Sequence, residues 1–220
     1  MELTLTLAER ETLIEVTTVI VAGWTGRDRA AVEQHMAELE ELGVPRPSSV
    51  PVFYRVSASR LTTALAIEST AASSGEVEAV LLRHAGRLWV GVGSDHTDRD
   101  VETYSVAVSK QLCDKPITAE LWPYDEVVPH WDRLILRSWI TEAGAEVAYQ
   151  EGTLDALLRP EELLGGVEPP FADGSMMFCG TLAARGGVRP AETFRYELAD
   201  PVSGRTLAAR YDVRTLPLVS

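Results

Sequence analysis

The sequence predicts a mainly β protein with flanking helices, an α+β fold. Short apolar stretches rich in Val, Ile and Thr recur along the 220 residues and are separated by turn residues. Residues 27–42 and 98–113 have apolar residues at helical spacing, and residues 154–164 are expected to form a short helix. Hydrophobic residues make up 45% of the chain, enough for a sizeable core. The length suits one domain, or one domain with a small N-terminal subdomain.

The N-terminal region is expected to contain two strands and a helix. Residues 2–7 alternate polar and apolar side chains, as a half-buried strand does. Residues 12–22 are rich in Val, Ile and Thr and suit a second strand paired to the first. In the helix at 27–42, Thr25 is the expected cap, with Asp28 as its acidic partner. The apolar face of this helix is Val32, Met36, Leu39 and Leu42.

The rest of the chain is expected to be rich in strands. The predicted elements are strands at 51–56, 61–68, 76–83 and 88–92, a helix at 98–113, a hairpin of 133–140 with 146–150, a short helix at 154–164 and an all-β tail from Ser175. The helix at 98–113 would carry Val101, Tyr104, Val108 and Leu112 on one side.

The charge balance argues against two classes of partner. Acidic residues outnumber basic ones by 33 to 20, for a formal charge of −13. Nucleic acids and anionic membranes both attract clustered Lys and Arg, which this sequence lacks, so neither is an expected partner. Cys113 and Cys179 belong to no metal-binding pattern and are expected to be buried, reduced thiols. Because the first residues include several charges, no signal peptide is expected, and we expect a cytoplasmic protein.

The most informative stretch contains Glu76 and Glu78. Side chains two apart in a strand point to the same face, so these carboxylates should lie side by side. Such a pair repels itself and resists burial, and a divalent cation with oxygen ligands would relieve both effects. The alternative is an ordinary strand whose polar face lies in water.

A third acid follows the next strand. The apolar residues 88–92 lead directly into a polar stretch that begins at Asp95. If this strand pairs with the one that carries Glu76 and Glu78, Asp95 can face the same cation. Asp98 and Asp100 are better explained as acids near the start of a helix. The predicted ligands are therefore Glu76, Glu78 and Asp95, around Mg²⁺ or Mn²⁺, with Ca²⁺ as a further candidate.

These motifs together resemble the fumarylacetoacetate hydrolase superfamily. Its pattern is Glu-x-Glu on a strand and then Asp-x-Thr-x-Arg-Asp, which here are residues 76–78 and 95–100. The resemblance continues at Ser109-Lys110, at 150–153 and at 179–181, and it extends from about residue 19 to about residue 206. It implies a β-roll with flanking helices, a homodimer, a bound divalent cation, and hydrolysis or decarboxylation of β-diketo or oxo acids. It also implies an N-terminal subdomain at 1–50, which could close as a lid, and a catalytic β-roll at 51–220.

The resemblance further implies roles for individual residues. His35 and Glu38 lie three apart on one helix and would activate water, whereas the alternative is an exposed polar pair. Lys110 would hold negative charge in the reaction. The expected substrate contacts are Arg55, Arg99, Glu102, Gly180 and Thr181. Two positions depart from the pattern, because Glu102 stands where the family has Gln and Leu182 where it has Pro.

The resulting hypothesis is a metal-dependent hydrolase or lyase that cleaves a carbon–carbon bond in a small β-diketo or 2-oxo acid. The alternatives are a non-catalytic module that binds a small anion or metal in the same cleft, and a structural β protein without a site.

Overall fold

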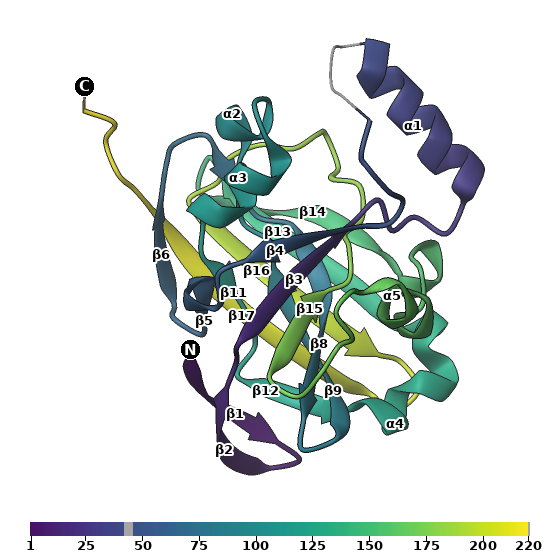
Figure 1. Ribbon diagram of the computed structural model, residues 1–220. Coiled ribbons are helices and arrows are strands. Elements are labelled where there is room, and N and C mark those ends of the chain that lie inside the picture. The colour runs from purple at the N-terminus through teal and green to yellow at the C-terminus, as the bar shows by residue number, and fades with distance from the viewer. Residues whose placement is uncertain (42–45, 220) are drawn as a thin grey trace.

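The computed structural model describes residues 1–41 and 46–219, with the side chains of residues 35, 38, 39 and 41 outside the description. The expectation of a mainly β fold with flanking helices is confirmed (Figure 1). The strands are β1 (Glu2–Leu7), β2 (Arg10–Glu15), β3 (Thr18–Gly23), β4 (Val52–Val56), β5 (Leu61–Thr62), β6 (Ala66–Ser69), β7 (Ser73–Ser74), β8 (Val77–His84), β9 (Arg87–Ser94), β10 (Thr97–Asp98), β11 (Lys115–Pro116), β12 (Glu120–Pro123), β13 (Ile135–Glu142), β14 (Ala145–Thr153), β15 (Ser175–Phe178), β16 (Thr193–Asp200) and β17 (Arg205–Thr215). The helices are α1 (Arg29–Glu41), α2 (Arg99–Glu102), α3 (Val106–Leu112), α4 (Tyr124–Val127) and α5 (Pro160–Gly166), with short 3₁₀ turns at Ala58–Arg60, Val128–Arg133 and Leu154–Ala156.

Two sheets form the body of the molecule. The larger has eight strands in the order β2-β1-β12-β9-β8-β15-β3-β4, and the smaller has five in the order β14-β13-β16-β17-β6. β8 alternates between two apolar clusters, as strand geometry requires. Val77, Ala79 and Leu81 pack with residues of the smaller sheet, whereas Val80 and Leu82 pack on the opposite face of the larger sheet. Glu78 therefore lies on the face opposite the core that the two sheets share.

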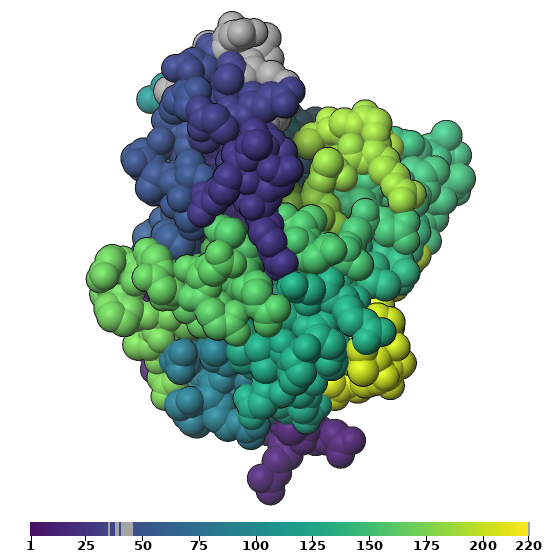
Figure 2. All heavy atoms as spheres, turned by 90° about the vertical axis from the view of Figure 1, so that its right-hand side faces the viewer, coloured from purple at the N-terminus to yellow at the C-terminus, as the bar shows by residue number. Residues whose placement is uncertain are grey.

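The strands on the two sides of the expected domain boundary at residue 50 belong to one sheet. β3 pairs with β15 in parallel and with β4 in an antiparallel arrangement, so strands from both sides of residue 50 share their hydrogen bonds. Helix α1 lies outside the two sheets at the top of the molecule, and the β1–β2 hairpin projects at the bottom (Figures 1 and 2). Across the described residues, no helix is long and apolar enough to cross a membrane.

The predicted strand at 12–22 is two strands. β2 pairs with β1, whereas β3 pairs with β15 and β4. At the break, the amide nitrogens of Thr17 and Thr18 donate to the carbonyl of Gly174, at 2.9 and 3.2 Å. The chain therefore changes partner at Thr17, which the uniform β-branched composition conceals.

Both longer predicted helices also differ in detail. Helix α1 is capped by Asp28 rather than Thr25, because Asp28 Oδ1 accepts from the amides of Ala30 and Ala31 at 3.0 and 3.1 Å. The predicted helix at 98–113 is two short helices, and Ser105 caps the second by accepting from Val108 N at 3.4 Å.

The predicted apolar side of the 98–113 segment faces solvent. Tyr104, Val108 and Leu112 are exposed there, whereas Ser109 and Lys110 are buried. The segment thus turns a lysine, rather than its apolar stripe, toward the interior.

Candidate metal centre

Three carboxylates converge where β8 and β9 meet. Glu76 precedes β8, Glu78 lies within it, and Asp95 follows β9. The two strands are antiparallel, with Glu78 opposite Gly93, and the amide of Asp95 donates to the carbonyl of Glu76 at 2.9 Å. One carboxylate oxygen from each of the three acids lies within 4.8 Å of the others. The structure therefore brings together the three acids that the sequence predicts as ligands.

Burial makes this cluster electrostatically costly. Asp95 is 0% exposed and Glu78 is 2% exposed. Burial, and then the charge of Asp95, raise the pKa of Glu78 well above its usual value, although Gly180 N donates to Glu78 Oε2 at 2.6 Å. Burial also raises the pKa of Glu76, partly offset by Arg99. These carboxylates resist ionisation unless positive charge approaches them.

Two buried lysines hold the third acid ionised. The ammonium group of Lys110 donates to Asp95 Oδ2, and Lys115 Nζ lies 3.3 Å from Asp95 Oδ1. Burial opposes the charge of Asp95, but these two lysines outweigh it, so the pKa of Asp95 lies below its usual 3.8. Lys115 is fully buried and donates to the carbonyls of His96 and Cys113 at 2.6 and 3.0 Å.

One oxygen of the cluster fits a bound cation. Asp95 Oδ1 is buried and accepts no hydrogen bond from any described residue. Lys115 Nζ lies 3.3 Å from this oxygen, but a buried oxygen without a hydrogen bond still costs free energy, and a metal ion would supply a further partner. Three carboxylates are hard oxygen donors of the kind that Mg²⁺, Mn²⁺ and Ca²⁺ prefer. Glu76, Glu78 and Asp95 could therefore hold a divalent cation.

Arg99 connects two acids at the edge of the cluster. Its Nη2 lies 3.4 Å from Glu76 Oε2, and its Nη1 donates to Glu102 Oε2 at 2.8 Å. Its Nε also donates to Ser74 Oγ at 2.7 Å. The acid at position 102 is thus paired with a cation, which reduces its repulsion of any anion that approaches it.

Gly180 and Thr181 lie beside the strand that carries Glu78. Gly180 has a φ of +100°, and a Cβ atom there would lie 1.8 Å from Thr25 Oγ1. Only glycine lets the backbone bring its amide so close to Glu78. Thr181 Oγ1 donates to the carbonyl of Val77 at 2.9 Å and accepts from Gln150 Nε2 at 2.8 Å. Its hydroxyl is thus engaged within the protein.

The structure does not place Arg55 with the acids, contrary to its predicted contact with the same substrate. In the β3–β4 register Arg55 pairs with Ile20, and Tyr54 pairs with Val21. Ile20 belongs to the core shared by the sheets, whereas Val21 belongs to the opposite cluster, on the side of Glu78. Strand alternation therefore directs Tyr54 toward the acids and Arg55 away from them. Lys110 Nζ accordingly lies 5.8 Å from the centre of the Tyr54 ring.

Two of the predicted catalytic side chains cannot be placed. His35 and Glu38 belong to α1, but their side chains lie outside the described part of the structure. Their role in activating water stays a prediction.

Sequence reasoning missed a second group of residues behind the acids. His96 Nδ1 and Nε2 lie 2.9 Å from Tyr211 Oη and Ser73 Oγ, and Tyr211 Oη lies 2.8 Å from Ser94 Oγ. Burial lowers the pKa of His96 to about 3, so its ring is neutral at physiological pH. Its position directly after Asp95 was the only signal in the sequence. The expected thiols, Cys113 and Cys179, are both free and buried.

Comparison with solved structures agrees with this architecture. A protein of the fumarylacetoacetate isomerase/hydrolase type from Oleispira antarctica superposes with a TM-score of 0.71 at 19% identity, covering 96% of this chain and 100% of its own. A yeast protein of the fumarylacetoacetate hydrolase family gives 0.64 at 15% identity, covering 93% and 95%. A 2-keto-3-deoxy-D-arabinonate dehydratase, solved with magnesium and 2,5-dioxopentanoate, gives 0.64 at 16% identity, covering 94% and 77%.

At sequence level the match is to a family without an assigned activity. No curated protein matches the chain. The family model described as "Protein of unknown function (DUF2848)" matches residues 22–211. The chain therefore belongs to this DUF2848 family, and its fold is that of the fumarylacetoacetate hydrolase-family proteins.

Proposed function

We propose that the protein is a divalent-metal-dependent hydrolase or lyase that cleaves a carbon–carbon bond in a small β-diketo or 2-oxo acid. The observation that carries this proposal is the convergence of Glu76, Glu78 and Asp95, each of which offers a carboxylate oxygen within 4.8 Å of the others. The likeness to a dehydratase solved with magnesium and a dioxo acid supports it at the level of the fold.

The three carboxylates would hold Mg²⁺ or Mn²⁺. When bound, the cation supplies Lewis-acid polarisation of a substrate carbonyl. Glu76, Glu78 and Asp95 would all be ionised in that state, because the positive charge offsets the burial, and the smaller repulsion between the acids, that raise the pKa of the two glutamates.

Lys110 would stabilise negative charge that develops on a substrate oxygen. Burial opposes its charge, but Asp95 and Glu76 outweigh this effect and hold its pKa above the usual 10.5. The side chain is therefore an ammonium ion at neutral pH and serves as a cation rather than as a base. A fixed charge in a site shielded from water is more effective than the same charge in solvent.

The charge balance favours an anionic substrate. Four acids, Glu76, Glu78, Asp95 and Glu102, surround three cations, Lys110, Lys115 and Arg99. One divalent cation changes this excess of one negative charge into an excess of one positive charge, which suits the carboxylate of an oxo acid.

Water activation is assigned to α1. The helix lies outside the sheets (Figure 1), and we propose that it closes over the site as a lid and presents His35 and Glu38 to the substrate. A homodimer, as the family resemblance implies, and a cytoplasmic location complete the proposal.

A substrate screen tests this function. Oxaloacetate, acylpyruvates and related diketo acids are incubated with the protein and Mg²⁺ or Mn²⁺, and products are identified by NMR. We expect turnover that EDTA abolishes. Lys110→Met should lower kcat by about 100-fold while metal affinity, measured by calorimetry, is not weakened. Arg214→Met, which changes an exposed arginine, is the control.

Two results would contradict the proposal. A protein that binds the metal but turns over none of these acids would instead support a non-catalytic binding module. A protein that binds no divalent cation would remove the basis of the site.

A further inference from the structure

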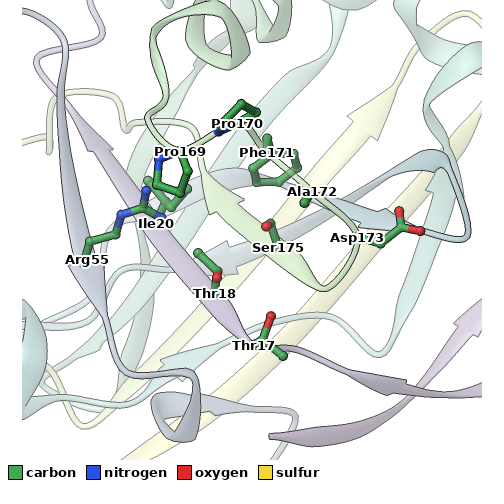
Figure 3. Close-up of a pocket in the computed structure, with 10 residues that line it drawn as sticks. All are labelled: Thr17, Thr18, Ile20, Arg55, Pro169, Pro170, Phe171, Ala172, Asp173 and Ser175. Atoms are coloured by element: carbon green, nitrogen blue, oxygen red, sulfur yellow. The ribbon is translucent and has the colours of Figure 1, made fainter.

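A hollow lies on the opposite face of the larger sheet from the acids. It has a volume of about 390 Å³, within the range of pockets that bind small molecules. Its floor is formed by β3 and β15, and the loop after α5 covers one side (Figure 3). It includes Arg55, the residue that strand alternation directs away from the metal centre.

One arginine supplies a positive charge at the rim of this pocket. Arg55 is exposed, and its Nη2 donates to the carbonyl of Glu168 at 2.7 Å. This bond orients the guanidinium group. Within residues 1–41 and 46–219, its Nε and Nη1 donate to no protein atom, so they are available to a ligand. Figure 3 shows Arg55 at the left of the hollow and Phe171 above its centre, with Ser175 and Thr18 below Phe171.

Two hydroxyl groups on the floor add further polar contacts. Thr18 and Ser175 are paired in the β3–β15 register, so their side chains share one face of the sheet. Neither hydroxyl makes a hydrogen bond to another described residue, although Ser175 is only 5% exposed. The acid on the rim is already engaged, because both oxygens of Asp173 accept from Gly86 N, at 3.0 and 3.1 Å.

The remainder of the lining is apolar. Ile20 and Phe171 are 0% and 7% exposed, and Pro169 and Pro170 form part of the wall. A second cation stands behind Phe171, since the guanidinium carbon of Arg83 lies 6.0 Å from the centre of its ring. Arg83 Nε is buried and donates to no described residue. Positive charge, free hydroxyls and apolar walls therefore occur together in a protein whose net charge is −13.

We infer that this pocket binds a small carboxylic acid with an apolar body. Arg55 and the hydroxyls of Thr18 and Ser175 would receive the carboxylate, and Phe171, Pro169 and Pro170 would contact the apolar part. A guanidinium group and hydroxyls are donors that match a carboxylate. The site is separate from the metal centre and does not depend on the proposed reaction.

Titration with phenylacetate, followed by ¹H–¹⁵N NMR without metal, tests this inference. We expect saturable shifts of the amide signals of residues 18–20 and 171–175. Arg55→Met should weaken binding about tenfold or more, because it removes the charged donor and keeps the length of the side chain. Arg10→Met, at an exposed arginine on β2, should bind as the unchanged protein does. Phenylacetamide, which has the same body without the charge, should bind more weakly.

Three results would overturn the inference. They are the absence of shifts at these amides, equal affinity in Arg55→Met, and equal affinity for phenylacetamide. A Glu76→Ala protein separates this site from the metal centre, since phenylacetate should bind it unchanged. Loss of binding in Glu76→Ala would instead place the ligand at the acids.

Discussion

Replacing Glu78 with Gln should change the response of the protein to both metal and pH. The side chain is 2% exposed, and its Oε2 accepts from Gly180 N at 2.6 Å. Gln keeps the shape and an acceptor oxygen but cannot ionise, so the change isolates the charge. With the cation at about 100 times its Kd, the free energy of unfolding of the unchanged protein should rise by about 2.7 kcal/mol. For a chain of this length that corresponds to a rise in Tm of about 5–10 °C. Glu78→Gln should lose most of this rise.

In metal-free protein at high pH, the same substitution should raise stability rather than lower it. Because burial raises the folded-state pKa of Glu78, its contribution to stability is fully present below the unfolded value of about 4.5 and is lost as pH rises through the folded value. Each pKa unit between the folded and unfolded values corresponds to about 1.4 kcal/mol in the free energy of unfolding. Above the folded value, metal-free Glu78→Gln should therefore be more stable than the unchanged protein.

Differential scanning calorimetry between pH 5 and 9, with and without Mn²⁺, measures both effects. Glu68→Gln is the matched control, since Glu68 is an exposed glutamate on β6 and should show neither. A Mn²⁺-dependent rise in Tm that survives in Glu78→Gln would refute the reasoning. A metal-free variant that is no more stable than the unchanged protein at high pH would refute it as well.

Three further perturbations test the surroundings of the acids. Gly180→Ala should lower the free energy of unfolding, measured by urea titration, by about 2–4 kcal/mol, because φ is +100° and its Cβ would lie 1.8 Å from a buried hydroxyl oxygen. Gly165→Ala is the control, since its Cβ would meet no atom within 4 Å beyond its own helix backbone, and it should leave this free energy unchanged. Tyr211→Phe should lower the free energy of unfolding by about 1–3 kcal/mol, because it removes the hydroxyl that contacts His96 and a serine. Tyr196→Phe is the control, since its hydroxyl bonds to no described residue, and it should change this free energy little. Because burial holds the pKa of His96 at about 3, its contribution to stability is present above its unfolded value of 6.5 and is lost as pH falls toward 3. His96→Gln should therefore reduce the loss of stability in acid, and an unchanged acid transition would contradict this assignment.

Much of the fold could be predicted because side-chain alternation is a local property. Alternation identified β1 and placed Glu76 and Glu78 on one face before any pairing was known, and apolar stretches on either side of a turn identified β8 and β9. The position of Asp95 followed from one assumption, that the strand before it pairs with β8, and the register confirms that assumption.

The remaining features depend on contacts between distant parts of the chain. Tyr54 and Arg55 are neighbours on β4, so one must point toward the acids and the other away from them. The sequence could not tell which, because the choice depends on how β4 pairs with β3. Lys115 is a buried cation that is tolerated only because Asp95 and two carbonyls surround it. In the segment 98–113, the spacing of apolar residues predicted the wrong buried face, because the pairing of Lys110 with Asp95 outweighs the burial of that stripe.

The central claim is that Glu76, Glu78 and Asp95 together hold one divalent cation. Anomalous diffraction from a crystal grown with Mn²⁺ locates that ion directly. We predict one strong peak bounded by the three carboxylates, with an oxygen of each acid at coordination distance. Anomalous peaks only elsewhere on the protein, or none at millimolar Mn²⁺, would contradict the claim.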